Sequence, residues 1–165
     1  MWEAEVGAAH EGGLLVSEED RDLDEATLDA IRRQRFGVRS ALGELEGAVA
    51  APAAGRPKEW VANVVDRAIS LRAAFDEHIT VTEGSGGLFD EVLGQAPRLS
   101  NQVNKLRAEH STIGAGLDAL IGAPANEVGD VRAAAVRVMG ELVHHRSDGS
   151  SLIYEAYFVD IDAAD

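Results

Sequence analysis

The segment PKEWVANVVDRAISLRAAFDEHITVTEG, residues 57–84, indicates the fold of the chain. Its apolar positions recur at alternating steps of three and four residues, which is the spacing of one face of an α-helix. Pro57 suits the first turn of such a helix, and the run GSGG that follows Glu83 ends it. The face consists of Val61, Val64, Ala68, Leu71, Phe75, His78 and Thr82. We therefore expect a long amphipathic helix that buries this face in a protein core.

Three other long segments repeat the same spacing. One starts after Asp24, a suitable N-cap, and ends in the linker AAPAAGRP; the others begin near Leu99 and Val131. The piece LFDEVLGQA, residues 88–96, predicts a short connecting helix. Together these segments predict an all-α protein, an antiparallel four-helix bundle with a short helix between its second and third long helices. Residues 1–23 are expected to form an acidic N-terminal lead-in, and residues 24–165 the bundle.

Composition and charge restrict the partners that we expect. The 165 residues fit one domain, and 29 acidic against 15 basic side chains give a formal net charge of −14. Such a charge argues against nucleic-acid or anionic-membrane partners, which need basic patches. Cysteine is absent, no secretion signal is visible, and no apolar run is long enough to span a bilayer. We expect a cytoplasmic protein.

Three of the four apolar faces carry one histidine each, namely His78, His110 and His145, and the fourth carries Arg35. Burying a polar group without a partner costs about 1–3 kcal/mol in proteins, so one inward histidine is usually a satisfied core residue. Three histidines on three helices, all in phase with the core, form a different pattern. If they lie at one depth, they converge in the bundle interior, where neutral imidazoles are common metal ligands.

The stretches FDEHITVTEG, LRAEHSTI and LVHHRSDGSSLIYEAY resemble the hemerythrin-like (HHE cation-binding) family. The resemblance covers nearly the whole chain after Leu23. It implies a four-helix bundle with a non-haem di-iron centre, which histidines and carboxylates from all four helices hold. His78, His110 and His145 match the histidine positions of the second, third and fourth helices of that family.

Several positions depart from the pattern of the family. A histidine of the first helix and three further ligands are replaced by Arg35, Thr82, Gly114 and Gly149, in chain order. The nearby carboxylates are candidate ligands, namely Glu83, Glu109 and Asp148. On a regular helix, however, none of them is in phase with the inward histidine of the same helix. The sequence therefore predicts a ligand set with fewer carboxylates than two irons need.

Two functional interpretations follow from this ligand set. The sequence favours a reduced, histidine-only interior site that binds metal weakly or not at all, in a bundle that acts as a binding or structural protein and not as an enzyme. Space beside Arg35, Thr82, Gly114 and Gly149 would then hold water or a small anion. The alternative is a mono- or dinuclear non-haem iron protein that handles iron, oxygen or reactive oxygen or nitrogen species, with zinc as the second choice of metal. A third interpretation, a mononuclear metal hydrolase or oxidase, would need a general base, and the sequence identifies none.

Overall fold

The computed structural model describes residues 25–124 and 127–157, except for the side chains of residues 25–32, 34 and 35. The predicted N-cap Asp24 and the acidic lead-in, residues 1–23, lie outside this description. The long helices are α1 (Glu25–Ala50), α2 (Pro57–Glu83), α4 (Ser100–Ile121) and α5 (Val128–Tyr157). The short helix α3 (Leu88–Gln95) and the 3₁₀ turn η2 (Pro97–Leu99) join α2 to α4.

The described part of the chain is all-helical, as the sequence predicted, and contains no strand. Helix α2 begins at Pro57 and ends at Glu83, and Gly84 caps it by donating its backbone N–H to the Thr80 carbonyl. Helix α3 is the predicted connecting helix. None of the described helices is both long enough and apolar enough to cross a lipid bilayer.

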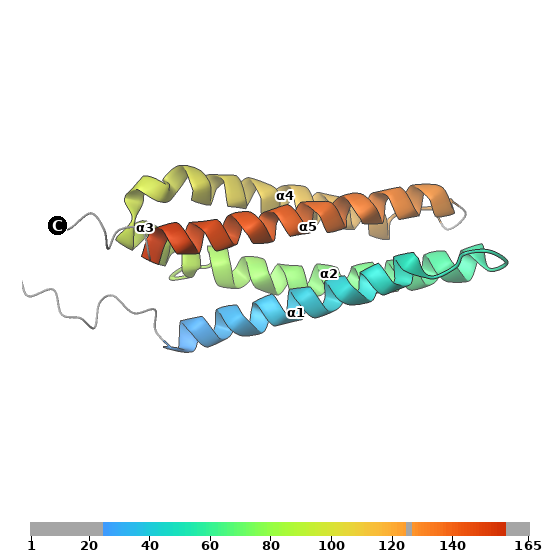
Figure 1. Ribbon diagram of the computed structural model, residues 1–165, viewed down its shortest axis with the longest axis horizontal. Coiled ribbons are helices and arrows are strands. Elements are labelled where there is room, and N and C mark those ends of the chain that lie inside the picture. Colours follow the sequence, from blue (N-terminus) through green and yellow to red (C-terminus); the bar gives the residue numbers. More distant parts are fainter. Residues whose placement is uncertain (1–24, 125–126, 158–165) are drawn as a thin grey trace, which may run out of the picture.

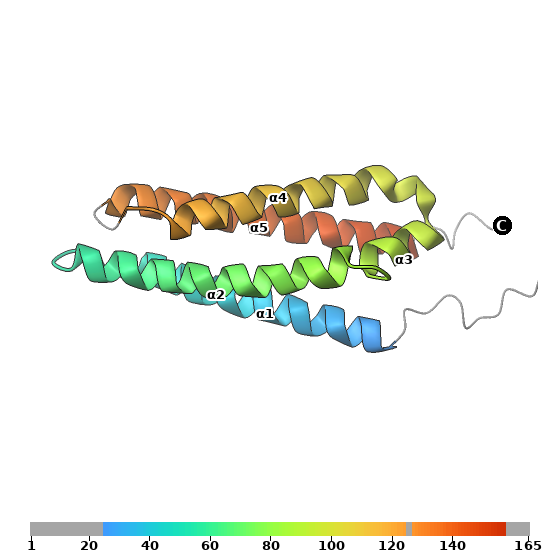
Figure 2. The same ribbon diagram turned by 180° about the vertical axis from the view of Figure 1, so that it is seen from behind.

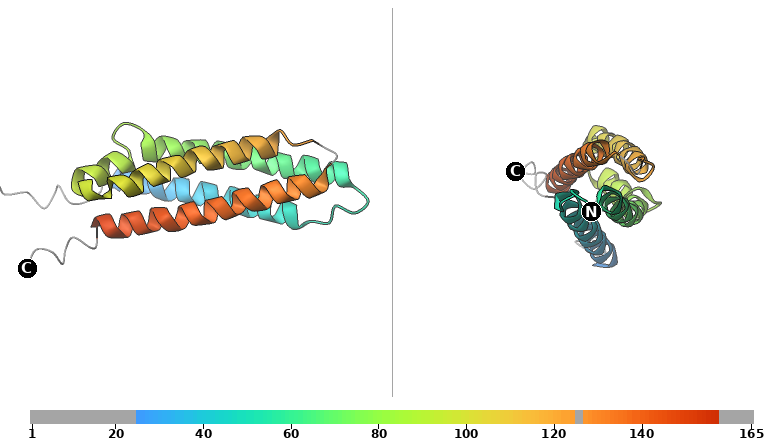
Figure 3. Two further views of the ribbon diagram at one scale, coloured as in Figure 1. Left: turned by 90° about the horizontal axis from the view of Figure 1, so that it is seen from above. Right: turned by 90° about the vertical axis from the view of Figure 1, so that its right-hand side faces the viewer.

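The four long helices lie lengthwise beside one another (Figures 1 and 2). Helices α1 and α2 form one neighbouring pair and α4 and α5 the other, while α3 lies at the end of the molecule where α2 ends (Figure 1). The end-on view in Figure 3 shows the long helices arranged around a shared interior. The apolar faces that the sequence predicted are therefore turned toward one another.

The buried apolar side chains of the described residues form two clusters. The larger draws on all four long helices and includes Phe75, Ile113 and Leu142. The smaller surrounds α3 and includes Leu106 of α4 and Leu152 of α5. His110 lies between Leu106 and Ile113 along α4, and His145 lies between Leu142 and Leu152 along α5. The buried histidines therefore occupy the boundary between the two cores.

The far end of the bundle is held by Trp60 and Arg132. The Trp60 indole donates a hydrogen bond of 2.9 Å to the Ala51 carbonyl, which ties the connection between α1 and α2 to the start of α2. The Arg132 guanidinium of α5 lies 4.7 Å from the centre of the Trp60 ring and donates to the Val49 carbonyl at 2.7 Å. These contacts couple α1, α2 and α5 and help to set how they align along the bundle.

Candidate metal centre

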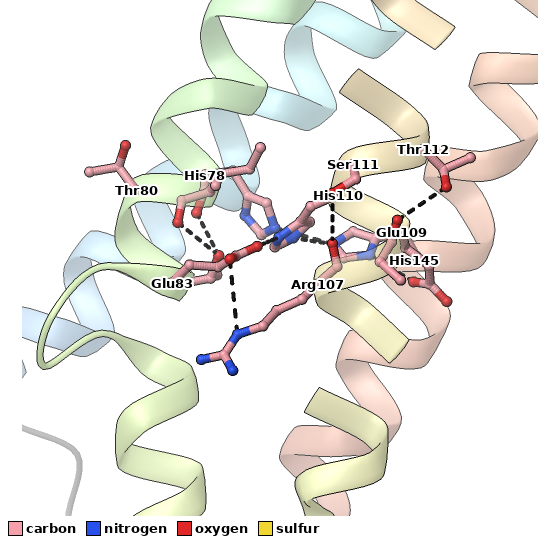
Figure 4. Close-up of polar contacts among 12 residues, drawn as sticks. His78, Thr80, Glu83, Arg107, Glu109, His110, Ser111, Thr112 and His145 are labelled. Atoms are coloured by element: carbon pink, nitrogen blue, oxygen red, sulfur yellow. Dashed lines mark hydrogen bonds and ion pairs between the residues drawn. The ribbon is translucent and has the colours of Figure 1, made fainter. Parts of the chain in front are cut away.

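His78 of α2, His110 of α4 and His145 of α5 point their rings toward one another in the bundle interior (Figure 4). The Nε2 atom of His145 lies 3.1 Å from Nε2 of His110 and 3.3 Å from Nε2 of His78. One ligand nitrogen from each ring lies within 4.8 Å of the other two. His110 and His145 are only 2% and 7% exposed. The sequence prediction that these three residues converge agrees with the structure.

Two of the three separations between these nitrogens are close to an edge of a metal coordination tetrahedron. Histidine nitrogens bind zinc at about 2.0–2.1 Å, so two such ligands at a tetrahedral angle lie roughly 3.3–3.4 Å apart. The observed Nε2 separations are 3.1 Å and 3.3 Å. Both pairs that include His145 therefore have nearly the separation of two ligands of one metal ion.

Two carboxylates hold the opposite ring nitrogens. His110 Nδ1 contacts Oε1 of Glu83 through a short hydrogen bond, and His145 Nδ1 lies 2.9 Å from Oε2 of Glu109. An ionised carboxylate only accepts hydrogen bonds, so the Nδ1 atoms of these two rings must donate. When a ring with its proton on Nδ1 is neutral, its Nε2 atom carries a lone pair. Such an arrangement of carboxylate, histidine and open nitrogen is typical of metal-binding histidines.

The contact between His110 and His145 lacks a proton when both rings are neutral. Burial holds the pKa of His110 below its ordinary value, although the hydrogen bond from His110 to Glu83 works in the opposite direction. Two Nε2 lone pairs then face each other at 3.1 Å, which is repulsive. A cation removes this repulsion, as a proton on one ring or as a metal ion bound to all three.

Each of the two carboxylates also lies near a cation. Arg107 Nε is 3.9 Å from Oε2 of Glu83, and Lys105 Nζ is 3.7 Å from Oε1 of Glu109. Lys105 also binds Asp148 at 2.6 Å and holds the pKa of that carboxyl below its usual range. Asp148 therefore takes part in a surface ion pair and does not join the histidine cluster.

Two phenylalanines enclose the histidines on their apolar sides. Phe75 is fully buried, and its ring centre lies 5.8 Å, 5.6 Å and 6.2 Å from those of His78, His110 and His145. Phe89 of α3 stacks on His110 at 5.8 Å. A shell of this kind limits the access of water and strengthens electrostatic interactions within the site.

The structure corrects part of the predicted pocket. A Cβ added to Gly114 would meet the Arg72 guanidinium at 3.8 Å, so this glycine faces α2 and not the histidines. Thr82 donates its hydroxyl to the His78 carbonyl at 2.9 Å, a hydrogen bond within its own helix. Gly149 does line a cavity beside His78 and His145. The side chain of Arg35 lies outside the described residues.

In the sequence, Glu83 and Glu109 are candidate ligands that lie out of phase with the histidine on the same helix. In the structure each carboxylate reaches a histidine of a neighbouring helix, because Glu83 is the last residue of α2 and Glu109 lies on the side of α4 that faces α5. The sequence does contain a signal for Glu109. It is adjacent to the inward His110 in the stretch AEH, so its side chain lies at the edge of the buried face, within reach of a neighbouring helix.

Comparisons of the chain with protein-family models, with curated proteins and with solved structures find no match. The resemblance to hemerythrin-like proteins stays a prediction. We therefore infer the function from the geometry of His78, His110 and His145 and from the carboxylates that contact two of these rings.

The Glu83→Gln variant tests the role of the carboxylates. The carboxylate charge orients His110 and makes its Nε2 a better electron-pair donor to a metal. Replacing the carboxylate by an amide removes this charge. We expect metal affinity to fall by about 10–100-fold, the usual effect of losing such a partner. Competition with a chromophoric chelator measures the change. Glu59→Gln is the matched control, since Glu59 is exposed in the first turn of α2, and an equal loss there would contradict the assignment.

Proposed function

We propose that this protein is a hemerythrin-like, antiparallel four-helix bundle that binds one divalent transition metal through Nε2 of His78, His110 and His145. The observation that carries the proposal is the 3.1 Å contact between the Nε2 atoms of His110 and His145, whose Nδ1 atoms both donate to carboxylates. A bound metal uses all three lone pairs at once, whereas a single proton lies between only two nitrogens.

The donor set supports a mononuclear site. Imidazole nitrogen suits zinc and ferrous iron, and three histidines leave further coordination positions open. We take ferrous iron as the first choice because of the resemblance to hemerythrin-like proteins, and zinc as the second. A bound ion supplies Lewis acidity at the open position. The chain's own residues orient the rings through Glu83 and Glu109 and pack against their apolar sides through Phe75 and Phe89.

A dinuclear centre does not fit the described residues. Two irons need several anionic ligands between and around them. Among the described residues, the cluster of converging ligand atoms consists of the three histidines. Glu83 and Glu109 contact the other edges of two of these rings, and Asp148 binds Lys105. We therefore infer one metal ion for each chain.

A metal-free bundle is the second candidate, and it was the interpretation that the sequence favoured. Thr82 and Gly149 supply no ligand, which is the observation in its favour. In that case one proton shared within the histidine cluster would relieve the repulsion between the rings. The protein would then act through binding in its interior or on its surface.

Metal content distinguishes the two candidates. Mass spectrometry is applied to untagged protein, as isolated and after anaerobic loading with ferrous iron, and separately after loading with zinc. We expect about one metal per chain after loading and a rise in melting temperature. At a free-metal concentration of 100 times Kd, binding stabilises the folded state by about 2.7 kcal/mol. For a chain of this length, that raises the melting temperature by roughly 5–10 °C.

Other stoichiometries decide against the proposal. Two irons per chain would mean that carboxylates outside the observed cluster complete a dinuclear site. The absence of metal after every loading would leave the metal-free bundle. Loading that persists in His145→Ala would show that metal binds elsewhere on this acidic chain.

A further inference from the structure

A cavity of about 410 Å³ opens between α1, α2 and α5, beside the histidine cluster. His78 and His145 form part of its wall, so the cavity reaches from the surface to the site. Most of the other described residues of its wall are apolar, with Phe75 and Leu142 buried and Phe36 68% exposed. A concave, largely apolar space with a few polar groups is the usual form of a small-molecule site.

Gly149 keeps one side of this cavity open. It lies one helical turn after His145 on α5, and a Cβ placed there would meet no atom within 4 Å. Glycine in the middle of a helix is destabilising by about 0.5–1 kcal/mol relative to alanine. Almost any other residue at position 149 would stabilise the helix and would also fill part of the cavity. Glycine at this position keeps the space beside His145 open.

Two arginines add positive charge to the same cavity. Arg39 of α1 and Arg146 of α5 both line it, and both residues are exposed. No carboxylate or carbonyl among the described residues pairs with either guanidinium. By contrast, Arg72 and Arg107 lie against Asp118 and Glu83. A protein with a net charge of −14 therefore leaves two cations available at the edge of one apolar cavity.

We propose that this cavity binds an amphipathic monocarboxylate, with its carboxylate between Arg39 and Arg146 and its apolar chain directed inward along Phe75 and Leu142. Guanidinium groups match carboxylates in shape and charge. At about 30 Å³ for each water-sized group, 410 Å³ accepts on the order of ten non-hydrogen atoms. A straight-chain carboxylate of about eight carbons fits that volume. The cavity shares His78 and His145 with the proposed metal centre, but carboxylate binding between the two arginines needs no metal and is tested in the metal-free protein.

Octanoate is the probe, titrated by calorimetry into the full chain in the presence of EDTA. We expect one octanoate per chain, and at least tenfold weaker binding of acetate, which lacks the chain, and of octylamine, whose charge is reversed. Arg39→Gln and Arg146→Gln should each weaken octanoate binding about tenfold, as expected for loss of a charge-assisted hydrogen bond. Raising the salt concentration should weaken binding in the parent protein and less so in the double variant.

Gly149→Leu tests the apolar part of the site. Leucine is a good helix former and would project into the open space, so we expect octanoate binding to be lost while the helix content by circular dichroism is kept. Gly140→Leu is the matched control, because Gly140 is also an open glycine of α5 but does not line the cavity. It should bind octanoate as the parent does.

Three results would overturn the proposal. Equal binding of octanoate and octylamine would show that the arginines play no part. Unchanged affinity in Gly149→Leu would place the ligand elsewhere. Binding only after zinc loading would place the carboxylate on the metal and not at the mouth. The first two results do not depend on whether the chain binds metal.

Discussion

Replacing His145 by alanine is expected to abolish stoichiometric metal binding and the thermal stabilisation that accompanies it. His145 is the central ring of the cluster, since its Nε2 contacts both of the other imidazoles. Without it, two histidines remain, and the hydrogen bond to Glu109 is lost as well. We expect affinity to fall by more than about 100-fold, beyond the usual effect of losing an outer-shell partner. Melting curves with and without metal should then superimpose.

His144→Ala is the matched control for this experiment. His144 is the preceding residue of α5 and is exposed. It should retain both the metal and the rise in melting temperature. Equal loss in the two variants would indicate that metal binds to surface histidines. An unchanged response in His145→Ala would contradict the three-histidine site itself.

Replacing Phe75 by alanine is expected to cause a large loss of folding stability, about 3–5 kcal/mol. Phe75 is fully buried, belongs to the larger apolar core and lies against all three histidine rings. Its removal deletes buried apolar surface and leaves a cavity beside polar groups. Urea unfolding of the metal-free protein measures the change, and a similar m-value in both proteins would show that the comparison is valid.

Phe36→Ala is the control for Phe75→Ala. Phe36 is 68% exposed on α1, so its truncation should change the free energy of unfolding by no more than about 0.5 kcal/mol. A cost below about 1 kcal/mol for Phe75→Ala would mean that the packing around the histidines is looser than described. Phe75→Leu should fall between the two, because it keeps most of the apolar volume.

The positions of the helices and of the inward histidines followed from the sequence. Pro57 and the glycines after Glu83 mark both ends of α2, because proline is favoured at a helix start and glycine favours its end. His110 and His145 were predicted to face inward because they share the 3.6-residue period of the apolar residues around them. This part was accessible because helical phase is a local property that each segment carries by itself.

The partners of those histidines were decided by the tertiary structure. Glu83 and Glu109 are out of phase on their own helices, yet each accepts a hydrogen bond from a histidine of another helix. Gly114 shares the phase of the core, yet the Arg72 side chain of α2 lies beside it. Phase tells which face of a helix is buried, but the neighbour at each edge of that face depends on the rotation and axial shift of the packed helices. The sequence by itself therefore determined that three imidazoles enter the core, while packing decided which carboxylates orient them.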